Sequence, residues 1–298
     1  MTLQDLRYVV ALADHGHFGR AAAACSIGQS TLSTQVKKLE KRLGVTLFER
    51  TTQSVRVTAV GADIAGRARR VLADVEAIDS VGRAMSGPLT GTFSLGVIPT
   101  LGPYLLPWLV PALRAGYPEL RLTVREDLTD PLLDSLRTHR LDAALVALPV
   151  HDDGVEALPV FDEPFRFAEA RRRSPAAAGV MTEAELCGQR LLLLTEGHCL
   201  RDQALAICGA AGADADGDFR ATSLETILQM VAIGLGSTLL PAMACSGESA
   251  RAVTTRPLDP GLGRRIGLAC RRGCSRLRDI HLLADVLREN LPSSVHAL

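Results

Sequence analysis

The chain has 298 residues, 47% of them hydrophobic, and its 33 basic and 33 acidic side chains give a formal net charge of zero. This length allows two or three compact units, each with its own core. No stretch reaches the roughly 18 apolar residues of a membrane span, and the N-terminus lacks a signal-peptide pattern, so we expect a cytoplasmic protein. Its seven cysteines should then be thiols, because that compartment keeps them reduced.

Residues 17–43 have the pattern of a helix-turn-helix. An alanine-rich helix is followed by Gly28, which we expect to supply a turn conformation that other residues avoid. The second helix has an apolar stripe and, on its other face, short polar side chains suited to base edges in a major groove. The stripe consists of Leu32, Val36, Leu39 and Leu43. The predicted DNA contacts are Gln29, Ser30, Thr31, Ser33, Thr34 and Lys37, with Arg50 and Arg56 on the segment that follows.

That following segment predicts a two-stranded wing at 45–50 and 55–58. Residues 1–60 carry eight Lys or Arg and four Asp or Glu, a local net charge of +4 that leaves −4 for the rest of the chain. A solvated helical hairpin is the alternative interpretation. The wing and the local basic charge favour a winged DNA-binding domain that contacts phosphates.

A single long helix is predicted for residues 60–86. Ile64, Val71, Ile78 and Met85 recur every seven residues, which is typical of a seam for a partner helix. The alternative is a helix packed on its own domain. The length of the repeat between two domains favours a dimerising linker.

From about residue 89 strands and helices alternate, which predicts an α/β domain of two lobes with a mostly parallel sheet covered on both faces. Ligands of such sheets bind beyond the carboxyl ends of strands, here after Ile98, Arg125 and Leu194. The predicted strands are 92–98, 120–125, 141–148, 191–194, 219–222, 237–240 and 265–271. The predicted helices are 103–115, 131–140, one through 210, 224–233 and 279–289.

The N-terminal pattern, with segments 98–107, 197–204 and 219–226, resembles the LysR-type transcriptional regulators and, within them, the hydrogen-peroxide sensors. The likeness covers the whole chain. It implies a winged helix-turn-helix at 1–60, a linker helix at 61–88, and an effector domain at 89–298 like the type 2 periplasmic binding proteins. Its lobes are expected at 89–162 with 267–298, and at 163–266.

The same resemblance implies a redox switch. Cys199 would be oxidised by peroxide and Cys208 would then form a reversible disulfide with it. The residues implied to hold peroxide are Thr100, Thr129, His198 and one of Arg264 and Arg265, of which we prefer Arg264.

Cys199 also has features that suit a thiolate when the residues are read alone. It is expected to open a helix, whose N-terminus favours negative charge, with His198 beside it and Arg201 two residues on. Spacing alone is weak evidence, since buried inert cysteines are the commoner case. No role is assigned to Cys25, Cys187, Cys245, Cys270 or Cys274.

The expected partners are double-stranded promoter DNA and a second copy of the chain, with a tetramer, RNA polymerase and a thiol reductant such as glutaredoxin or thioredoxin implied by the resemblance. We expect no cofactor and no metal, because Cys270 and Cys274 have no second ligand pair nearby. Two alternatives stay open. One is a regulator that binds a small organic effector in the inter-lobe cleft, and the other is a thiol peroxidase.

Overall fold

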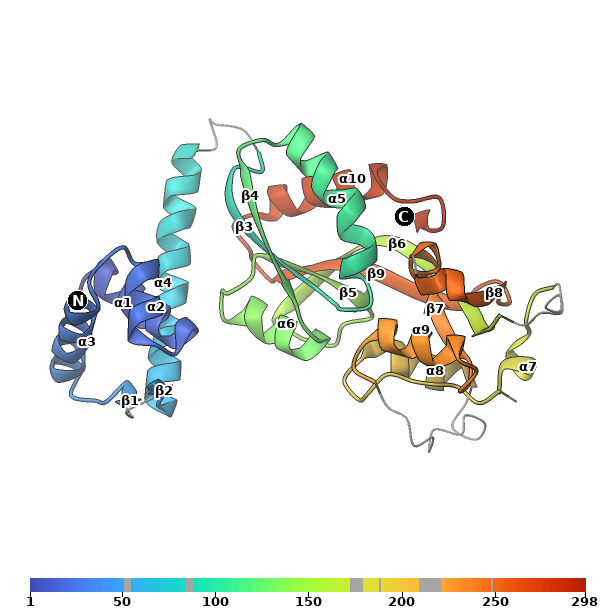
Figure 1. Cartoon of the computed structure of the whole chain (residues 1–298). Helices are drawn as coiled ribbons and strands as arrows, with labels where there is room; N and C mark the ends of the chain where they lie inside the picture. Colours follow the sequence, from blue (N-terminus) through green and yellow to red (C-terminus); the bar gives the residue numbers. More distant parts are fainter. Residues whose placement is uncertain (51–54, 84–87, 172–178, 188, 209–220, 248) are drawn as a thin grey trace. The chain divides into compact units, whose positions relative to one another are not determined.

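The computed structural model describes all residues except 51–54, 84–87, 172–178, 188, 209–220 and 248 (Figure 1). The chain divides into two compact units, residues 1–87 and, apart from the turn Thr138–Arg140, residues 88–298. Across the described residues, no helix combines the length and the apolar character needed to cross a membrane.

The first unit is a winged helix-turn-helix followed by a long helix. Thr2 and Asp5 form a reciprocal capping box at the start of the first helix. The core lies where three short helices meet the long one and includes Val9, Leu12 and Val36. The elements are α1 (Leu3–His15), α2 (Phe18–Ala24), α3 (Gln29–Leu43), β1 (Phe48–Arg50), β2 (Val55–Val57) and α4 (Ala59–Arg83).

The turn between α2 and α3 differs from the prediction in one respect. Gly28 is the N-cap of α3 with an extended backbone (φ −71°), so the prediction that it supplies an unusual turn conformation is wrong. The left-handed residue of this turn is Ser26, with φ 55°. At the start of α2, His17 caps the helix, because its Nδ1 accepts a hydrogen bond from the Gly19 N–H at 3.0 Å.

The wing is fixed to α3 by one carboxylate. Glu40 Oε1 accepts hydrogen bonds from the backbone N–H groups of Leu47, at 2.8 Å, and Phe48, at 3.1 Å. Leu32, Val36 and Leu39 are buried as predicted. The fourth member of the predicted stripe, Leu43, is 38% exposed, because α3 ends there.

The long helix α4 changes its surroundings along its length. Ile64 packs against the core of the first unit, where Ala65 and Ala68 are also buried. Beyond them, Val71 is 43% exposed and Ile78 is 71% exposed. Of the seven-residue repeat, Ile64 therefore packs on its own domain, whereas Val71 and Ile78 are exposed. Met85 lies outside the described residues.

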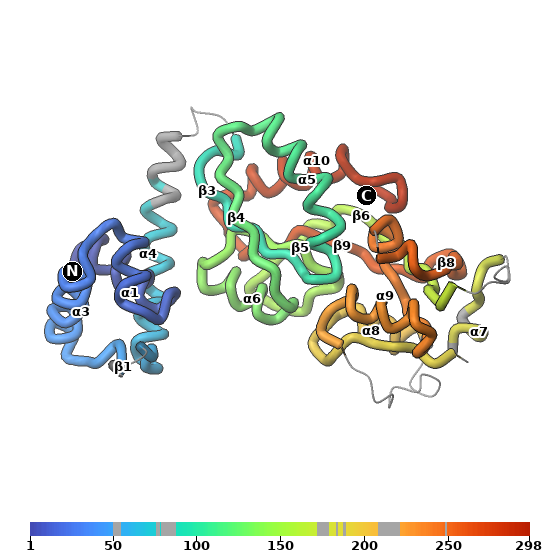
Figure 2. The backbone as a smooth tube through the Cα atoms, in the orientation of Figure 1, coloured from blue at the N-terminus to red at the C-terminus, as the bar shows by residue number. Residues whose placement is uncertain are grey.

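The second unit is built from two sheets that share a strand. Figure 2 follows its backbone from β3 to the C-terminal segment. Its strands are β3 (Gly91–Val97), β4 (Leu120–Glu126), β5 (Ala143–Leu148), β6 (Val155–Ala170), β7 (Thr238–Pro241), β8 (Val253–Pro257), β9 (Gly263–Arg271) and β10 (His296–Ala297). Its helices are α5 (Gly102–Gly116), α6 (Thr129–Arg137), α7 (Glu183–Cys187), α8 (Cys199–Cys208), α9 (Leu224–Ala232), α10 (Leu277–Glu289) and the 3-10 helices η1 (Ala242–Ser246) and η2 (Ser249–Ala252).

The sheet is mixed, so the prediction of a mostly parallel sheet is wrong. Strand β3 pairs in parallel with β4 and β5, but β9 runs antiparallel to both β5 and β6. The order is β10-β6-β9-β5-β3-β4, and β6 also pairs antiparallel with β7 and β8. The predicted strand 191–194 forms only isolated bridges, at Leu191 and Leu194. Of the predicted strand 219–222, only Ala221 and Thr222 are described, and Ala221 bridges Leu194.

Two separate hydrophobic cores define the two lobes. The first surrounds β3, β5 and β9 and contains Phe93, Phe161 and Leu268. The second surrounds β7, α8 and α9 and contains Phe167 and Leu240. Strand β6 contributes to both cores, and the two lobes join along it.

Candidate functional site

Cys199 lies where the two lobes meet. It is the first residue of α8, and its side chain packs against the core of the first lobe, whereas Leu200 and Ala204 of the same helix are buried in the second. The turn before it needs Gly197, whose φ is 89° and where an added Cβ would approach Leu128 Cδ1 to 3.0 Å. The start of α8 is therefore held against both lobes.

Opposing effects act on the Cys199 thiol. Burial raises its pKa above the ordinary value of 9.0, and this outweighs the Arg264 guanidinium and the Leu200 backbone N–H, which favour the thiolate. The Asp202 carboxylate adds to the increase. The features that favour the thiolate, a nearby cation and a helix N-terminus, are therefore opposed by burial at this position.

The positive charge near the sulfur comes from Arg264 rather than from Arg201. The Arg201 side chain turns back and donates a hydrogen bond from Nη1 to the Leu194 carbonyl oxygen at 3.2 Å. Arg264 is 4% exposed and lies on β9. Sequence spacing suggested Arg201 because it is near in the chain, whereas Arg264 approaches through the sheet pairing.

Arg264 is the centre of a buried network. Its Nη1 donates to Thr100 Oγ1 at 2.8 Å and its Nη2 to the Thr100 carbonyl oxygen at 3.0 Å. Its Nε donates to Glu163 Oε2 at 2.9 Å, and Nη2 lies 2.8 Å from the same oxygen. Glu163 Oε1 accepts from the Met243 N–H at 2.9 Å. The next arginine, Arg265, points outward instead and pairs with Asp162.

Thr100 and Thr129 have different surroundings. Thr100 follows β3, is 2% exposed and accepts from Arg264, which leaves its own hydroxyl hydrogen for another acceptor. Thr129 is the first residue of α6, and its Oγ1 is buried without a hydrogen-bond partner in the described part of the chain. A buried hydroxyl without a partner is costly, so a polar ligand or water at Thr129 would be stabilised.

His198 is buried beside Cys199. Its side chain is 6% exposed, and burial lowers the pKa of its imidazole below 6.5. The ring is therefore neutral near pH 7, with one nitrogen able to donate and the other to accept. A neutral donor next to the sulfur can bind a peroxide oxygen without adding charge.

The remaining cysteines lie in different places. Cys208 is the last residue of α8, and its side chain, like that of Cys187, lies outside the described residues. Cys245 is half-buried, and burial raises its pKa to about 11. Cys270 and Cys274 are buried free thiols, and Cys25 is a half-buried one in the first unit. Among the residues that the structure covers, no three His, Cys, Asp or Glu side chains are arranged to hold a metal.

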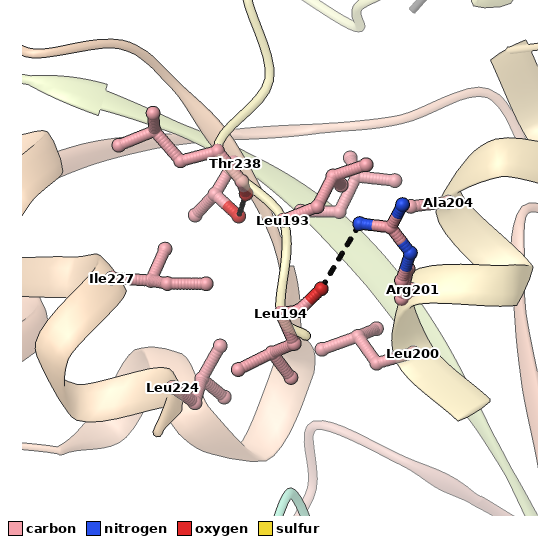
Figure 3. Close-up of a pocket in the computed structure, with 10 residues that line it drawn as sticks. Leu193, Leu194, Leu200, Arg201, Ala204, Leu224, Ile227 and Thr238 are labelled. Carbon is pink, nitrogen blue, oxygen red and sulfur yellow. Dashed lines mark hydrogen bonds between the residues drawn. The ribbon is translucent and has the colours of Figure 1, made fainter. Parts of the chain in front are cut away.

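A small apolar pocket lies under the inner face of α8, inside the second lobe. Its volume is about 10 Å³, and its walls include Leu200 and Ala204 of α8 and Leu224 and Ile227 of α9 (Figure 3). A cavity of this volume has room for about one water molecule, so the inner face of α8 is closely packed.

The predicted DNA-contacting residues gather on the exposed side of α3. Gln29, Ser30, Thr31, Thr34 and Lys37 are exposed and Ser33 is half-buried. Thr34 Oγ1 donates to the Ser30 carbonyl at 2.9 Å, so its hydroxyl is partly engaged within the helix. Arg56 is exposed on β2, and the side chain of Arg50 lies outside the described residues.

Two residues at the lobe junction were absent from the sequence prediction. Glu163 completes the Arg264 network, and Tyr104 packs against both cores. Burial, with the Glu225 carboxylate, raises the pKa of Tyr104 to about 12, although Arg264 acts in the opposite direction. The local sequence does not mark Glu163, because it lies in a strand that was not predicted and meets Arg264 only through the pairing of β6 with β9.

Comparison with known proteins gives a consistent result. Residues 3–62 match the bacterial regulatory helix-turn-helix of the lysR family, and residues 86–292 match the LysR substrate binding domain. The DNA-binding transcriptional dual regulator OxyR of Escherichia coli K12 is 42% identical over 293 residues, covering 98% of this chain and 96% of that protein. A probable hydrogen peroxide-inducible genes activator of Streptomyces viridosporus is 45% identical over 97% of this chain and 94% of that protein.

Two solved structures extend the comparison to the fold. A full-length cysteine-to-aspartate variant of OxyR from Pseudomonas aeruginosa has a TM-score of 0.83 and 39% identity, covering 100% of this chain and 98% of that one. An H2O2-bound cysteine variant of OxyR from Corynebacterium glutamicum has a TM-score of 0.67 and 36% identity, covering 97% and 92%.

Proposed function

Because this chain belongs to the OxyR group of the LysR family of transcriptional regulators, we propose that it binds promoter DNA and senses hydrogen peroxide through Cys199. The observation that carries this proposal is the position of Cys199 at the lobe junction, at a helix N-terminus and near the buried Arg264 guanidinium. The H2O2-bound state of the Corynebacterium glutamicum relative supports peroxide as the ligand.

Peroxide would bind through hydrogen bonds from neutral groups. The free hydroxyl hydrogen of Thr100, the partnerless Thr129 Oγ1 and the neutral His198 imidazole are the groups that we assign to its two oxygens. Held in this way, the near oxygen would lie in line with the sulfur, which lowers the entropic cost of the attack. Hydrogen peroxide has only two heavy atoms, so it suits a small site formed by the hydroxyl side chains of Thr100 and Thr129.

The chemical step is an oxidation of sulfur by peroxide. The Cys199 thiolate attacks one oxygen, an S–O bond forms and the O–O bond breaks, and the leaving hydroxide takes up the proton released from the thiol to give water. Sulfur is oxidised to sulfenic acid and peroxide is reduced. The Cys208 thiol then attacks this sulfur, forming the disulfide and releasing a second water.

The disulfide requires α8 to unwind. Cys199 and Cys208 are the ends of this helix, nine positions apart, so their Cα atoms are separated by about 13.5 Å at 1.5 Å per residue. A disulfide tolerates at most about 7 Å. Oxidation therefore exchanges helical hydrogen bonds for a covalent link, which makes α8 a two-state element of the kind that a switch needs.

The output of the switch is transcription. We assign the exposed side of α3 to the major groove, with Gln29 and Ser33 toward bases and Lys37 toward a phosphate. The exposed Val71 and Ile78 on α4 would form the dimer seam that places two heads on two half-sites. A tetramer, RNA polymerase contact, reversal by glutaredoxin or thioredoxin, and a cytoplasmic location complete the proposal.

Regulation by a small organic effector is less well supported. An effector with a carboxylate would need a cation, and among the described residues Arg264 is the arginine or lysine that is buried at this junction. All three of its guanidinium nitrogens already bind Thr100 or Glu163. A carboxylate there would have to displace Glu163 and would leave that charge unpaired.

The test is mass spectrometry of thiols in the purified full chain, before and after sub-stoichiometric hydrogen peroxide. We expect a Cys199–Cys208 disulfide in the wild type and increased hydrogen exchange across residues 199–208. Cys208→Ser should stop at sulfenic acid on Cys199, and Cys199→Ser should show neither product. Cys245→Ser, a half-buried thiol of the same lobe, is the matched control and should behave as wild type. Oxidation spread evenly over other cysteines would refute the proposal.

A further inference from the structure

We propose that Glu163 is a positioning residue for peroxide sensing, which holds the Arg264 guanidinium against Thr100, in the orientation from which its charge acts on Cys199. This inference rests on the proposed function, since it names a residue that serves the same site. The Glu163 carboxylate binds Arg264 and the Met243 N–H rather than the groups assigned to peroxide, so it would act on the sulfur through Arg264.

The first argument is that the two carboxylate oxygens of Glu163 bind different partners. Oε2 accepts from Arg264 Nε and lies 2.8 Å from Nη2, which fixes one edge of the guanidinium plane. Oε1 accepts from the Met243 N–H in η1. One side chain thus ties β6, β9 and the start of η1 together, and the orientation of the guanidinium follows from the carboxylate.

The second argument is burial. Both side chains of the Arg264–Glu163 pair are fully inaccessible to solvent. A buried guanidinium without its counter-charge would move toward water or take water in, because a desolvated single charge is unfavourable. Glu163 is the acidic partner that keeps Arg264 inside the protein.

The third argument is the backbone at this point. Gly263 precedes Arg264, and an added Cβ there would lie 2.5 Å from the Glu163 carbonyl oxygen. The two strands are also paired in register, Glu163 opposite Arg264 and Pro164 opposite Gly263. The close approach and fixed register of β6 and β9 therefore restrict how the Glu163 carboxylate and the Arg264 guanidinium can be arranged.

The consequence for Cys199 follows from the charges around it. Arg264 on β9 favours the thiolate, whereas burial and Asp202 on α8 oppose it. The groups around Arg264 are Glu163, Thr100 and the Tyr104 phenol, which burial keeps protonated. If Arg264 turns away, its favourable interaction is lost, and Cys199 should ionise only at higher pH.

The chain offers a matched control one register position away. Asp162 and Arg265 form the same kind of ion pair on the same two strands, but both are exposed and lie outside the buried network. Asp162→Asn removes one charge from the same pair of strands as Glu163→Gln does. Only the second change should affect Cys199.

The experiment measures the rate of Cys199 oxidation by hydrogen peroxide as a function of pH in the full chain. Glu163→Gln cannot accept from both Arg264 and the Met243 N–H, because its amide nitrogen only donates. We expect its pH–rate profile to move to higher pH and its rate at neutral pH to fall about tenfold. Asp162→Asn should follow the wild type. Thermal unfolding of each variant reports folding separately.

A second variant covers the case in which Glu163→Gln does not fold. Glu163→Asp keeps the charge, but its side chain is one methylene shorter and cannot reach Arg264 and Met243 together, so a smaller shift to higher pH is expected. An unchanged profile in a folded variant would overturn the inference. So would a shift to lower pH, which would mean that Arg264 stays in place with its charge uncompensated. If the wild type itself gives no Cys199 oxidation, it is the proposed function that fails.

Discussion

Lys37 and Ser33 lie one turn apart on α3 but offer different groups to DNA. Lys37 is exposed and carries a mobile charge, which suits a phosphate, while Ser33 is half-buried and close to the helix axis, which suits a base edge. Lys37→Ala should weaken binding to all sequences and reduce the salt slope by about one unit. Ser33→Ala should lower discrimination between operator and random DNA.

Fluorescence anisotropy at several salt concentrations measures both effects. Arg114→Ala, which changes an exposed basic residue of α5 in the second unit, is the control and should leave the salt slope unchanged. Operator affinity that stays at the wild-type value in both α3 variants would show that this helix does not enter the groove.

We expect Cys270 to make the stability of the protein depend on pH in the alkaline range. Burial, reinforced by the neighbouring Cys274 and Glu156, raises its pKa from 9.0 to about 12. Below about pH 9 the thiol is neutral in both the folded and the unfolded chain, and its contribution is constant. Between about pH 9 and 12 the unfolded thiol ionises while the buried one does not, so stability is lost as pH rises.

Cys270→Ala should therefore lose less stability than the wild type between about pH 8 and 10.5. Urea unfolding midpoints at the two pH values measure the difference. Ser275→Ala, at an exposed neighbouring position, should retain the wild-type pH dependence. Equal losses in the wild type and Cys270→Ala would mean that the thiol titrates normally.

Helix α8 is the proposed switch element, so its packing should affect the rate of disulfide formation. Its inner face is buried around a pocket of only about 10 Å³, which leaves no room for a larger side chain at Ala204. Ala204→Val should therefore overpack this face and destabilise the helix by about 1–3 kcal/mol. The expected result is faster disulfide formation with an unchanged rate of sulfenic acid formation at Cys199.

Rapid quenching with a thiol-alkylating reagent separates the two rates. The matched control is Ala206→Val, because residue 206 is exposed on the outer side of the same helix and does not line this pocket. If Ala204→Val and the wild type form the disulfide equally fast, packing under α8 does not limit the switch.

Among the elements, helices were predicted from the sequence better than strands. The apolar repeats placed α3, α5, α9 and α10 to within a few residues, because each buries one face at helical spacing. Strand β6 was not predicted at all. Pro159 and Pro164 interrupt its pattern, and the structure accommodates Pro159 at an irregularity in the β6–β9 register.

At the scale of the whole molecule, what local sequence could not supply was long-range pairing. Strand β9 lies antiparallel between β5 and β6. Arg264 and Glu163, which meet through this pairing, are 101 residues apart in the sequence, and neither local segment indicates its partner. For the same reason, Arg264 could be suggested by resemblance, but Glu163 could not be predicted as its partner. Cys199, by contrast, was placed at the start of a helix from a local pattern, and it begins α8.

The proposed dimer seam lies on α4. Val71 and Ile78 are exposed apolar residues on a helix whose earlier half packs on its own domain. A charge at either position would be buried without a partner in a helix seam, so Val71→Asp and Ile78→Asp should dissociate dimers and weaken operator binding.

Sedimentation velocity tests this expectation, with Asp74→Ala, at an exposed α4 position, as the control. Dimers that persist in both aspartate variants would exclude the seam on this face of α4.

The path of the chain through the two lobes has a consequence for synthesis. The chain leaves the first lobe at Pro164 and re-enters it at Gly263, and these two residues are register partners. Everything that forms the second sheet, β7, β8 and the far end of β6, lies between these points or next to them. The first sheet, however, lacks its interior strand β9 until residues 263–271 are made. During translation, all the strands of the second lobe are therefore made before the first lobe has its full set. Helix α8 can then fold on the core of the second lobe while the first lobe, which Cys199 contacts, is still incomplete.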